Sequence, residues 1–299
     1  MLQAYRSVLF VPGHRPTWVD KAVVSGADAV VLDLEDSVPS AEKAAARETV
    51  AASIGRVRQT NADVGLLVRV NPLATKLTGA DLEAVVGPGL DGVFAPKIEQ
   101  ATDVLQYDAL LDHFETRNGV TGLEYIVPVE TVKAIQNARE IASASPRVGA
   151  MIGPSAEHAD IARAVGYEWT PEGLETLYLR SRVLLACREA GIHPLTGLWE
   201  DLENLGGLKD FAVRGRQLGF RGMIAIHPSH VATVNEVFTP SDETVAFYEG
   251  MVAAYEEAAA AGTGALRYRG LHIDKAHYDK AVEWLEHVAR LRGEKGASE

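Results

Sequence analysis

Two acidic residues, Glu130 and Asp160, each follow a short apolar run. Glu130 ends the run IVPVE, and Asp160 follows the next run, in GPSAEHAD. If both runs are parallel strands, two carboxylates at adjacent strand ends hold one hard divalent cation, as proteins usually bind Mg²⁺. Mn²⁺ accepts the same oxygen ligands. Alternatively, Glu130 forms a cap or a salt bridge and Asp160 starts a helix, where an acid favours the dipole. Glu157 and His158 are either further ligands or polar residues of a helix start.

Arg69 ends another apolar run, in VRVN. A guanidinium at a strand end suits bidentate binding of a carboxylate or an enolate oxygen. The same group also suits a structural ion pair with Asp33, Glu35 or Asp36, and the two roles are compatible. Arg69 is therefore a candidate for substrate binding and for catalysis.

The segment DLED places three acids within four residues, directly after the apolar run AVVL. Strand alternation turns Asp33 and Glu35 to one side, and Leu34 and Asp36 to the other. Acids this close together need cations nearby. The candidate cations are Arg69, Lys97 and Arg47. We interpret Glu35 and Asp36 as candidate catalytic groups, with a solvated loop as the alternative.

Two further basic residues follow apolar runs. Lys97 ends the run that closes with APK, where it either contacts a substrate anion, balances the acids, or is a surface ammonium. The stretch PGHRP offers turn amides and Arg15 to a phosphate group. Both are candidates for substrate binding.

These residues lie at the ends of eight short apolar runs that recur along the chain. The runs are RSVLFVPG (6–13), ADAVVLDLED (27–36), GLLVRVNP (65–72), GVFAPK (92–97), EYIVPVE (124–130), VGAMIGP (148–154), HPLTGLW (193–199) and GMIAIHP (222–228). Runs of this length suit strands buried on both faces of a parallel sheet, and most are separated by enough chain for a crossover helix. The pattern predicts a (β/α)8 TIM barrel, whose C-terminal strand ends carry the chemistry.

The pattern changes after residue 238. Residues 242–261 and 274–292 are predicted to be helices, joined by a turn-rich connection at 262–270. We therefore expect a barrel domain at 1–238 and a C-terminal helical extension at 239–299. The extension is not needed to close a barrel, so it is expected to act as a lid or as an arm that reaches a neighbouring subunit.

Bulk composition excludes several classes of protein. No run approaches the ~20 apolar residues of a membrane-spanning helix, and the N-terminus lacks the pattern of a secretory signal. The net charge of −12 argues against nucleic-acid binding. The single cysteine, Cys187, lies among apolar residues at helical spacing, which favours a core residue over a nucleophile. These features are typical of a cytoplasmic enzyme.

Several segments, in this order, resemble the citrate lyase β-subunit-like family, within the HpcH/HpaI aldolase superfamily. They are RSVLFVPG, ADAVVLDLEDSV, VRVN, APK, PVE, LGFRGMIAIHPSHVATVNEVFTPS and GLHIDKAHYDKA. The match spans almost the whole chain, and the combination of DLEDSV, RVN and IHP is specific.

The resemblance implies a (β/α)8 barrel that cleaves or forms a C–C bond next to a thioester, usually with Mg²⁺. It implies that Glu130 and Asp160 bind the metal and that Arg69 binds substrate oxygens. The residues implied to lie near a CoA moiety are Arg15, Lys21 and Pro228. Asp274 matches a C-terminal acid that reaches the active site of a neighbouring subunit, which implies a homotrimer or a hexamer built from trimers.

Two departures from the family pattern affect the expected site. The family commonly has GAED after the sixth strand, where this chain has the longer GPSAEHAD; the spacing from Asp160 to Gly166 supports Asp160 as the matching acid. The seventh run often ends in Asp, where this chain has Thr196. Substrate choice is therefore expected to differ from that of the best-known members.

The expected reaction is a Mg²⁺-dependent cleavage or formation of a 3-hydroxy-carboxyacyl-CoA of the malyl-, citramalyl- or citryl-CoA type. The products of cleavage are an acetyl-CoA-like thioester and a 2-oxo acid. Three alternatives stay open: a class II-type aldolase acting on free 2-oxo acids, a subunit acting on a thioester tethered to a carrier protein, and a barrel that binds acyl-CoA without catalysis. The presence of Arg69, Glu130, Asp160 and Asp274 together argues against the last.

Overall fold

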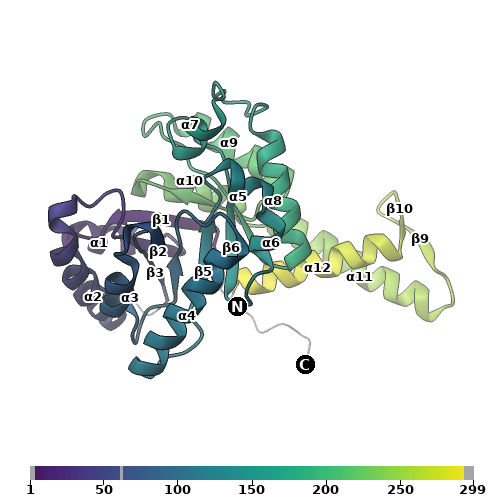
Figure 1. Cartoon of the computed structure of the whole chain (residues 1–299). Coiled ribbons are helices and arrows are strands. Elements are labelled where there is room, and N and C mark those ends of the chain that lie inside the picture. Colours follow the sequence, from purple (N-terminus) through teal and green to yellow (C-terminus); the bar gives the residue numbers. More distant parts are fainter. Residues whose placement is uncertain (1–3, 61–62, 293–299) are drawn as a thin grey trace. The chain divides into compact units, whose positions relative to one another are not determined.

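The computed structural model of the chain describes residues 4–60 and 63–292 (Figure 1). The chain divides into two compact units, Met1–Phe238 and Thr239–Glu299. Each unit is described by itself below. No helix among the described residues is long and apolar enough to cross a membrane.

The first unit is a closed parallel barrel of the predicted (β/α)8 type. Within the described residues its strands are β1 (Ser7–Pro12), β2 (Ala29–Asp33), β3 (Gly65–Arg69), β4 (Gly92–Phe94), β5 (Glu124–Pro128), β6 (Val148–Gly153), β7 (His193–Thr196) and β8 (Gly222–Ala225). Each strand pairs with its sequence neighbours, and β8 pairs with β1 to close the ring. All eight coincide with the apolar runs, so the C-terminal strand ends share one mouth.

Helices surround the strands (Figure 1). The helical elements of this unit are α1 (Pro16–Val23), η1 (Ser40–Glu42), α2 (Lys43–Thr60), η2 (Leu73–Thr75), α3 (Thr78–Val85), α4 (Ala101–Asn118), α5 (Val132–Gln136), α6 (Ala138–Ala142), α7 (Asp160–Val165), α8 (Leu177–Ala190), α9 (Leu205–Leu218) and α10 (Pro228–Phe238). The expected core residue Cys187 is buried in α8, where burial raises its thiol pKa to about 12.

Side-chain alternation divides the apolar residues of the strands into two layers. Val8, Ala29, Leu67, Ile126 and Ile224 belong to one buried cluster that takes members from all eight strands, so this cluster is the barrel interior. Their sequence neighbours, such as Leu9 and Val30, belong to a second, larger cluster that includes residues of the surrounding helices. This division explains why the runs are continuously apolar rather than alternating.

A folded-back segment precedes helix α8, which begins at Leu177. The segment before it folds back on itself, because Glu175 accepts hydrogen bonds from the backbone N–H and the hydroxyl of Thr170. Arg180, buried within α8, donates to the carbonyl of Gly173, whose φ is +68°. These contacts fix a turn where an uninterrupted helix would otherwise extend.

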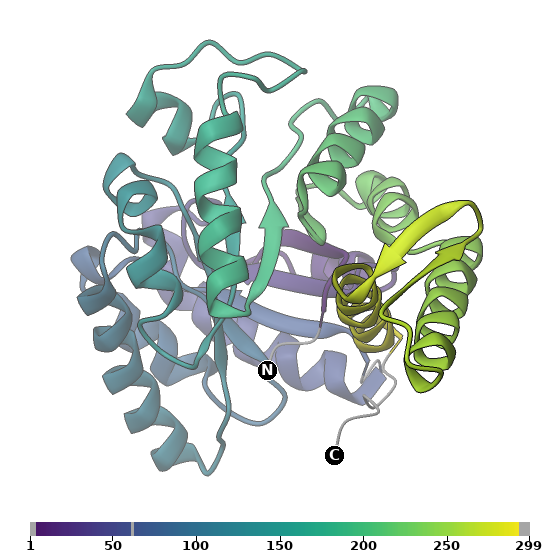
Figure 2. The same cartoon turned by 90° about the vertical axis from the view of Figure 1, so that its right-hand side faces the viewer.

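The second unit contains the two expected helices and a hairpin that was not expected. The elements are α11 (Asp242–Ala260), β9 (Ala265–Tyr268), β10 (Leu271–Asp274) and α12 (Lys275–Leu291). The strands pair antiparallel, and Figure 2 shows the hairpin beside the two helices. Arg269 and Gly270 both have positive φ, as a two-residue hairpin turn requires. The interpretation of 262–270 as a mere connection missed this hairpin, because its strands are short and Arg is not a typical residue of this turn.

Candidate active site

Arg69 and Asp33 form a two-pronged ion pair at the ends of the neighbouring strands β3 and β2. Arg69 donates from Nε to Asp33 Oδ1 at 2.6 Å and from Nη2 to Asp33 Oδ2 at 2.7 Å. The guanidinium also lies over the ring of Phe10, 5.1 Å from its centroid. Burial acts to raise the pKa of Asp33, but the hydrogen bonds and charge of Arg69 outweigh it, so the pKa is lowered. The structural pairing considered from the sequence is therefore present.

The two acids that follow Asp33 differ in exposure, and strand β2 ends before them, at Asp33. Glu35 is 4% exposed, and its Oε2 lies 3.0 Å from Arg69 Nη1. Burial raises the pKa of Glu35 to about 7, in spite of the opposing charge of Arg69. The side chain of Asp36 is 72% exposed, and its nearest oxygen is 3.7 Å from Arg69 Nη1. Glu35 thus belongs to the buried site, whereas Asp36 lies at its rim.

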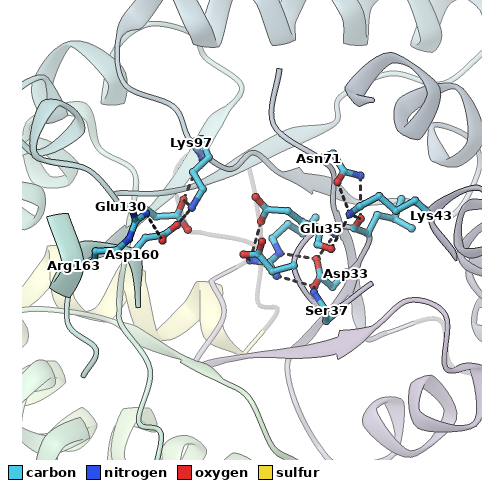
Figure 3. A network of polar contacts seen from close by, with 12 residues as sticks. Asp33, Glu35, Ser37, Lys43, Asn71, Lys97, Glu130, Asp160 and Arg163 are labelled. Atoms are coloured by element: carbon cyan, nitrogen blue, oxygen red, sulfur yellow. Dashed lines mark hydrogen bonds and ion pairs between the residues drawn. The ribbon is translucent and has the colours of Figure 1, made fainter. Parts of the chain in front are cut away.

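A second set of contacts holds the loop that carries these acids (Figure 3). Lys43 donates to the carbonyls of Leu34 and Glu35 at 2.8 and 2.9 Å, and to Asn71 Oδ1 at 2.6 Å. Lys43 and Asn71 were not predicted from the sequence as part of the site, although Asn71 completes the VRVN motif.

The expectation that Arg47 balances the DLED acids was wrong. Arg47 instead pairs with the fully buried Asp81, which also accepts from Asn71. Arg47 lies on α2 and Asp81 on α3, so this pair joins two helices rather than the strand ends.

Glu130 and Asp160 converge on the ammonium group of Lys97 (Figure 3). Lys97 Nζ lies 3.2 Å from Glu130 Oε2 and donates a hydrogen bond to Asp160 Oδ2. Arg163, one helical turn along α7, donates to the other oxygen of Asp160 at 3.0 Å. Burial raises the pKa of Glu130, although Lys97 opposes it, whereas the hydrogen bond from Lys97 lowers the pKa of Asp160. The two predicted metal ligands therefore share one cation.

A cavity of about 350 Å³ opens beside these groups. Arg69, Glu130 and Asp33 are among its charged lining residues, and Phe10, Phe94, Ile152, Leu198 and Ile224 are among its apolar ones. Glu35, Lys97 and Asp160 do not line it. A small ligand with both anionic and apolar parts would suit a cavity with this lining.

The seventh strand end adds no charge to this mouth. Thr196 is fully buried, and its hydroxyl has no hydrogen-bond partner among the described residues. The next residue, Gly197, lines the cavity, and a Cβ there would lie 2.4 Å from the carbonyl oxygen of Ser155. Glycine is thus needed where the seventh and sixth loops meet.

The expected CoA-contacting residues lie in segments that follow the adjacent strands β1 and β8. Arg15 precedes α1 and Lys21 lies in its last turn, while Pro228 begins α10; all three are exposed. Gly13 fixes the loop after β1, since its N–H donates to the carbonyl of Asp33 at 2.8 Å. Arg15 and Pro228 therefore follow the mouth ends of β1 and β8, whereas Lys21 lies at the far end of α1.

Asp274 belongs to the second unit, where it caps α12. Its carboxylate accepts from the backbone N–H groups of Ala276 and His277, and contacts His277 Nδ1 at 2.7 Å. The hydrogen bond from His277 lowers the pKa of Asp274.

A separate group, formed by Glu157, His158 and Glu200, lies in the loops after β6 and β7. His158 contacts Glu200 through its ring, at 3.0 Å, and through its backbone N–H. His158 therefore pairs with Glu200, and Glu157 lies 4.0 Å from the His158 ring. Glu200 was not predicted from the sequence.

The HpcH/HpaI aldolase/citrate lyase family matches residues 6–228, which include the whole barrel mouth. The chain belongs to this family. It is 37% identical to the L-malyl-CoA/beta-methylmalyl-CoA lyase of Cereibacter sphaeroides (strain ATCC 17025), over 92% of both chains. It is also 33% identical to the citrate lyase subunit beta of Leuconostoc mesenteroides subsp. cremoris, over 90% of this chain and 88% of the relative.

A solved structure of this HpcH/HpaI aldolase/citrate lyase family resembles the present one. The protein CitE from Mycobacterium tuberculosis, in complex with magnesium, acetoacetate and coenzyme A, matches with a TM-score of 0.70 and 26% identity. The match covers 96% of this chain and 98% of that one.

Proposed function

We propose that the protein is a Mg²⁺-dependent carbon–carbon lyase. Its substrate would be a 3-hydroxy-carboxyacyl-CoA of the malyl-, citramalyl- or citryl-CoA type. This proposal rests on one observation: Glu130 and Asp160 converge on the ammonium of Lys97. Glu130 lines the cavity together with Arg69. The 37% identity to an L-malyl-CoA/beta-methylmalyl-CoA lyase supports the choice of thioester.

The residues around Lys97 fit a magnesium ion. Glu130 and Asp160 supply carboxylate oxygens from neighbouring strand ends, and they already hold one positive charge between them. Mg²⁺ is commonly bound by one or two carboxylates together with water and substrate oxygens. When bound by Glu130 and Asp160, the ion supplies positive charge to oxygens that become more negative during the reaction.

The chain's own groups would then bind and orient the substrate. Arg69 is held by Asp33 and Phe10, and its guanidinium lines the cavity, so we assign it the binding of substrate oxygens. Glu35 is proposed to accept the hydroxyl proton, because a pKa of about 7 suits proton transfer near neutral pH. Cleavage breaks the bond between the carbinol carbon and the thioester α-carbon. The hydroxyl carbon becomes the 2-oxo acid, and the α-carbon takes a proton.

Asp274 of a neighbouring subunit, in a homotrimer or a hexamer, is proposed to protonate the thioester α-carbon in cleavage or to deprotonate it in the synthetic direction. Lys97 is proposed to contact the substrate, and Asp36 is proposed as a catalytic group at the rim of the site. The exposed residues Arg15, Lys21 and Pro228 are proposed to contact the CoA moiety. Anionic CoA suits the two basic side chains.

An assay by mass spectrometry tests this function. Purified protein with Mg²⁺ is offered malyl-CoA, β-methylmalyl-CoA, citramalyl-CoA and citryl-CoA separately, with EDTA controls. EDTA-sensitive release of acetyl-CoA or propionyl-CoA from one of them is expected. Turnover of free 4-hydroxy-2-oxo acids instead would favour the class II-type aldolase, and CoA-ester binding without turnover would favour a binding role.

A second candidate is a subunit that acts on a thioester tethered to a carrier protein. The 33% identity to a citrate lyase subunit beta favours it, whereas the net charge of −12 suits a typically acidic carrier poorly. Citryl-CoA and citryl-loaded carrier protein, offered at equal concentration, separate the two. A much higher kcat/KM for the tethered substrate would replace the proposed function by this one.

A further inference from the structure

Lys97 has a backbone conformation that lysine seldom adopts. Its φ is +55°, in the left-handed region that favours glycine. Two other described residues besides glycine share a positive φ, and both lie in turns: Lys76 ends η2, and Arg269 is in the hairpin of the second unit. Lys97 also lies in a turn, directly after Pro96, but this turn follows strand β4 at the barrel mouth. Such strain persists only where the surroundings fix the residue, and it commonly marks functional positions.

Both ends of Lys97 contact the predicted ligand pair. Its backbone N–H donates to Glu130 Oε2 at 3.4 Å, and its ammonium lies 3.2 Å from that same oxygen. The ammonium also donates to Asp160 Oδ2. The strained backbone therefore places one positive charge between two carboxylates that would otherwise repel each other.

A divalent cation held by both acids would lie close to this ammonium, which contacts one oxygen of each. Glu130 offers Oε2 to Lys97, and Asp160 offers Oδ2 to Lys97 and Oδ1 to Arg163. Two cations cannot share these oxygens at close range without strong repulsion. Metal binding at this pair therefore requires the ammonium of Lys97 to leave it.

We propose that Lys97 is an internal counter-ion, which keeps Glu130 and Asp160 together without metal and is displaced when Mg²⁺ binds. This inference rests on the metal assignment of the proposed function. Its consequence is a site that is already assembled before the metal arrives, but whose affinity is lowered by competition with its own lysine.

Isothermal titration of the full-length protein with Mg²⁺, and separately with Mn²⁺, tests the competition. In Lys97→Met the ammonium is absent, so each metal should bind roughly five- to tenfold more tightly, as expected for the loss of partly exposed ion pairs. The metal-induced rise in Tm should also be larger, because the metal-free variant leaves the two acids unbalanced. Lys97→Gly, which suits the positive φ, should show the same tighter binding without the strain.

The matched control is Lys209→Met, which removes an exposed lysine that pairs with Glu236 at 2.7 Å on the outer helices. Its metal affinity should equal that of the wild type. Unchanged or weaker binding in Lys97→Met and Lys97→Gly would overturn the proposal. Loss of binding in Glu130→Gln, together with unchanged binding in Lys97→Met, would leave the metal site standing and reject only the role of Lys97.

Amine labelling of the wild-type protein gives a test that does not depend on how the variants fold. Each lysine is acetylated with a limiting reagent in EDTA and in Mg²⁺, and peptides are quantified by mass spectrometry. Lys97 should be labelled several-fold faster in Mg²⁺, because its ammonium is released from the two acids, while Lys209 should not change. Equal or slower labelling of Lys97 in Mg²⁺ would show that the lysine stays on the carboxylates.

Discussion

Arg69 and Asp33, on neighbouring strands, form a bidentate ion pair with Nε–Oδ1 and Nη2–Oδ2 distances of 2.6 and 2.7 Å. The strands β2 and β3 are in register at these two residues, so the backbone itself sets the two groups opposite one another. The remaining nitrogen of Arg69, Nη1, lies 3.0 Å from Glu35 Oε2. Asp33 thereby fixes the direction of the guanidinium in the cavity.

Replacement of Asp33 by Asn should therefore reduce activity, because it removes the charge that holds Arg69. Loss of one partner from a buried ion pair costs about 3–5 kcal/mol of stability, and a misplaced Arg69 should lower kcat/KM about 100-fold. Denaturant unfolding and steady-state kinetics measure the two effects.

Asp28→Asn is the matched control for that experiment. Asp28 pairs with Arg6 just as closely, at 2.7 Å, but both residues precede their strands and lie at the opposite end of the barrel. This variant should lose stability and keep its kcat/KM. Equal loss of activity in both variants would mean that Asp33 acts only through stability.

Glu130→Gln and Asp160→Asn should each weaken Mg²⁺ binding, by about 100-fold or more, because each removes a charged oxygen ligand. Isothermal titration gives the affinity for Mg²⁺. Activity measured at saturating Mg²⁺ shows whether an excess of metal restores the activity of each variant. Glu157→Gln serves as the control, since Glu157 belongs to the exposed group with His158 and Glu200. If Glu157→Gln lost the metal and the other two kept it, the site would lie in the loops instead.

Glu35 should make stability depend on pH in an identifiable direction. Its pKa is raised from 4.5 to about 7 in the folded protein, so folding favours its protonated form. That contribution is fully present below pH 4.5 and is lost as the pH rises through 7, which amounts to on the order of 3 kcal/mol.

Unfolding of the wild type and of Glu35→Gln in EDTA, at several pH values from 4.5 to 8, isolates this contribution. The wild type should lose stability relative to Glu35→Gln as the pH rises, because Gln does not titrate. A constant difference between the two proteins would show that Glu35 ionises normally, and would remove the reason for assigning it the hydroxyl proton.

Much of the barrel could be predicted because its strands are buried on both faces. Runs such as AVVLD and GLLVR have the length and the polar ends that are typical of buried parallel strands. Alternation did not place the following acids, because strand β2 ends at Asp33 and Asp36 lies near the same guanidinium as Glu35. The family match confirmed the fold and the membership that the motifs indicated.

The contacts that could not be predicted depend on distances between segments far apart in the chain. The position of Lys97 between Glu130 and Asp160 depends on its positive φ. The sequence does not reveal this backbone conformation, because lysine rarely adopts it. Arg47 was expected near the acids, but the buried carboxylate of Asp81 on the next helix holds it. A choice between partners for one charged side chain is decided by packing, which charge and spacing alone do not encode.

Asp274 caps α12, and a single substitution can separate this capping from its proposed proton transfer. As the cap of α12 it accepts two backbone N–H groups, and its loss to Ala should cost about 1 kcal/mol. Asp274→Ser keeps a capping oxygen but removes the carboxylate, so it should retain stability. If the proposed proton transfer is correct, this variant should lose most of its kcat.

Mixed oligomers then test whether Asp274 acts on a neighbouring subunit. Asp274→Ser and Glu130→Gln are each expected to be nearly inactive. When they are dissociated together and reassembled in equal amounts, roughly a quarter of the active sites should combine an intact barrel with an intact neighbouring arm. Activity should return to about that fraction of the wild type. A mixture as inactive as its components would place Asp274 within its own subunit's site or outside catalysis, because only exchange between subunits can restore a complete site.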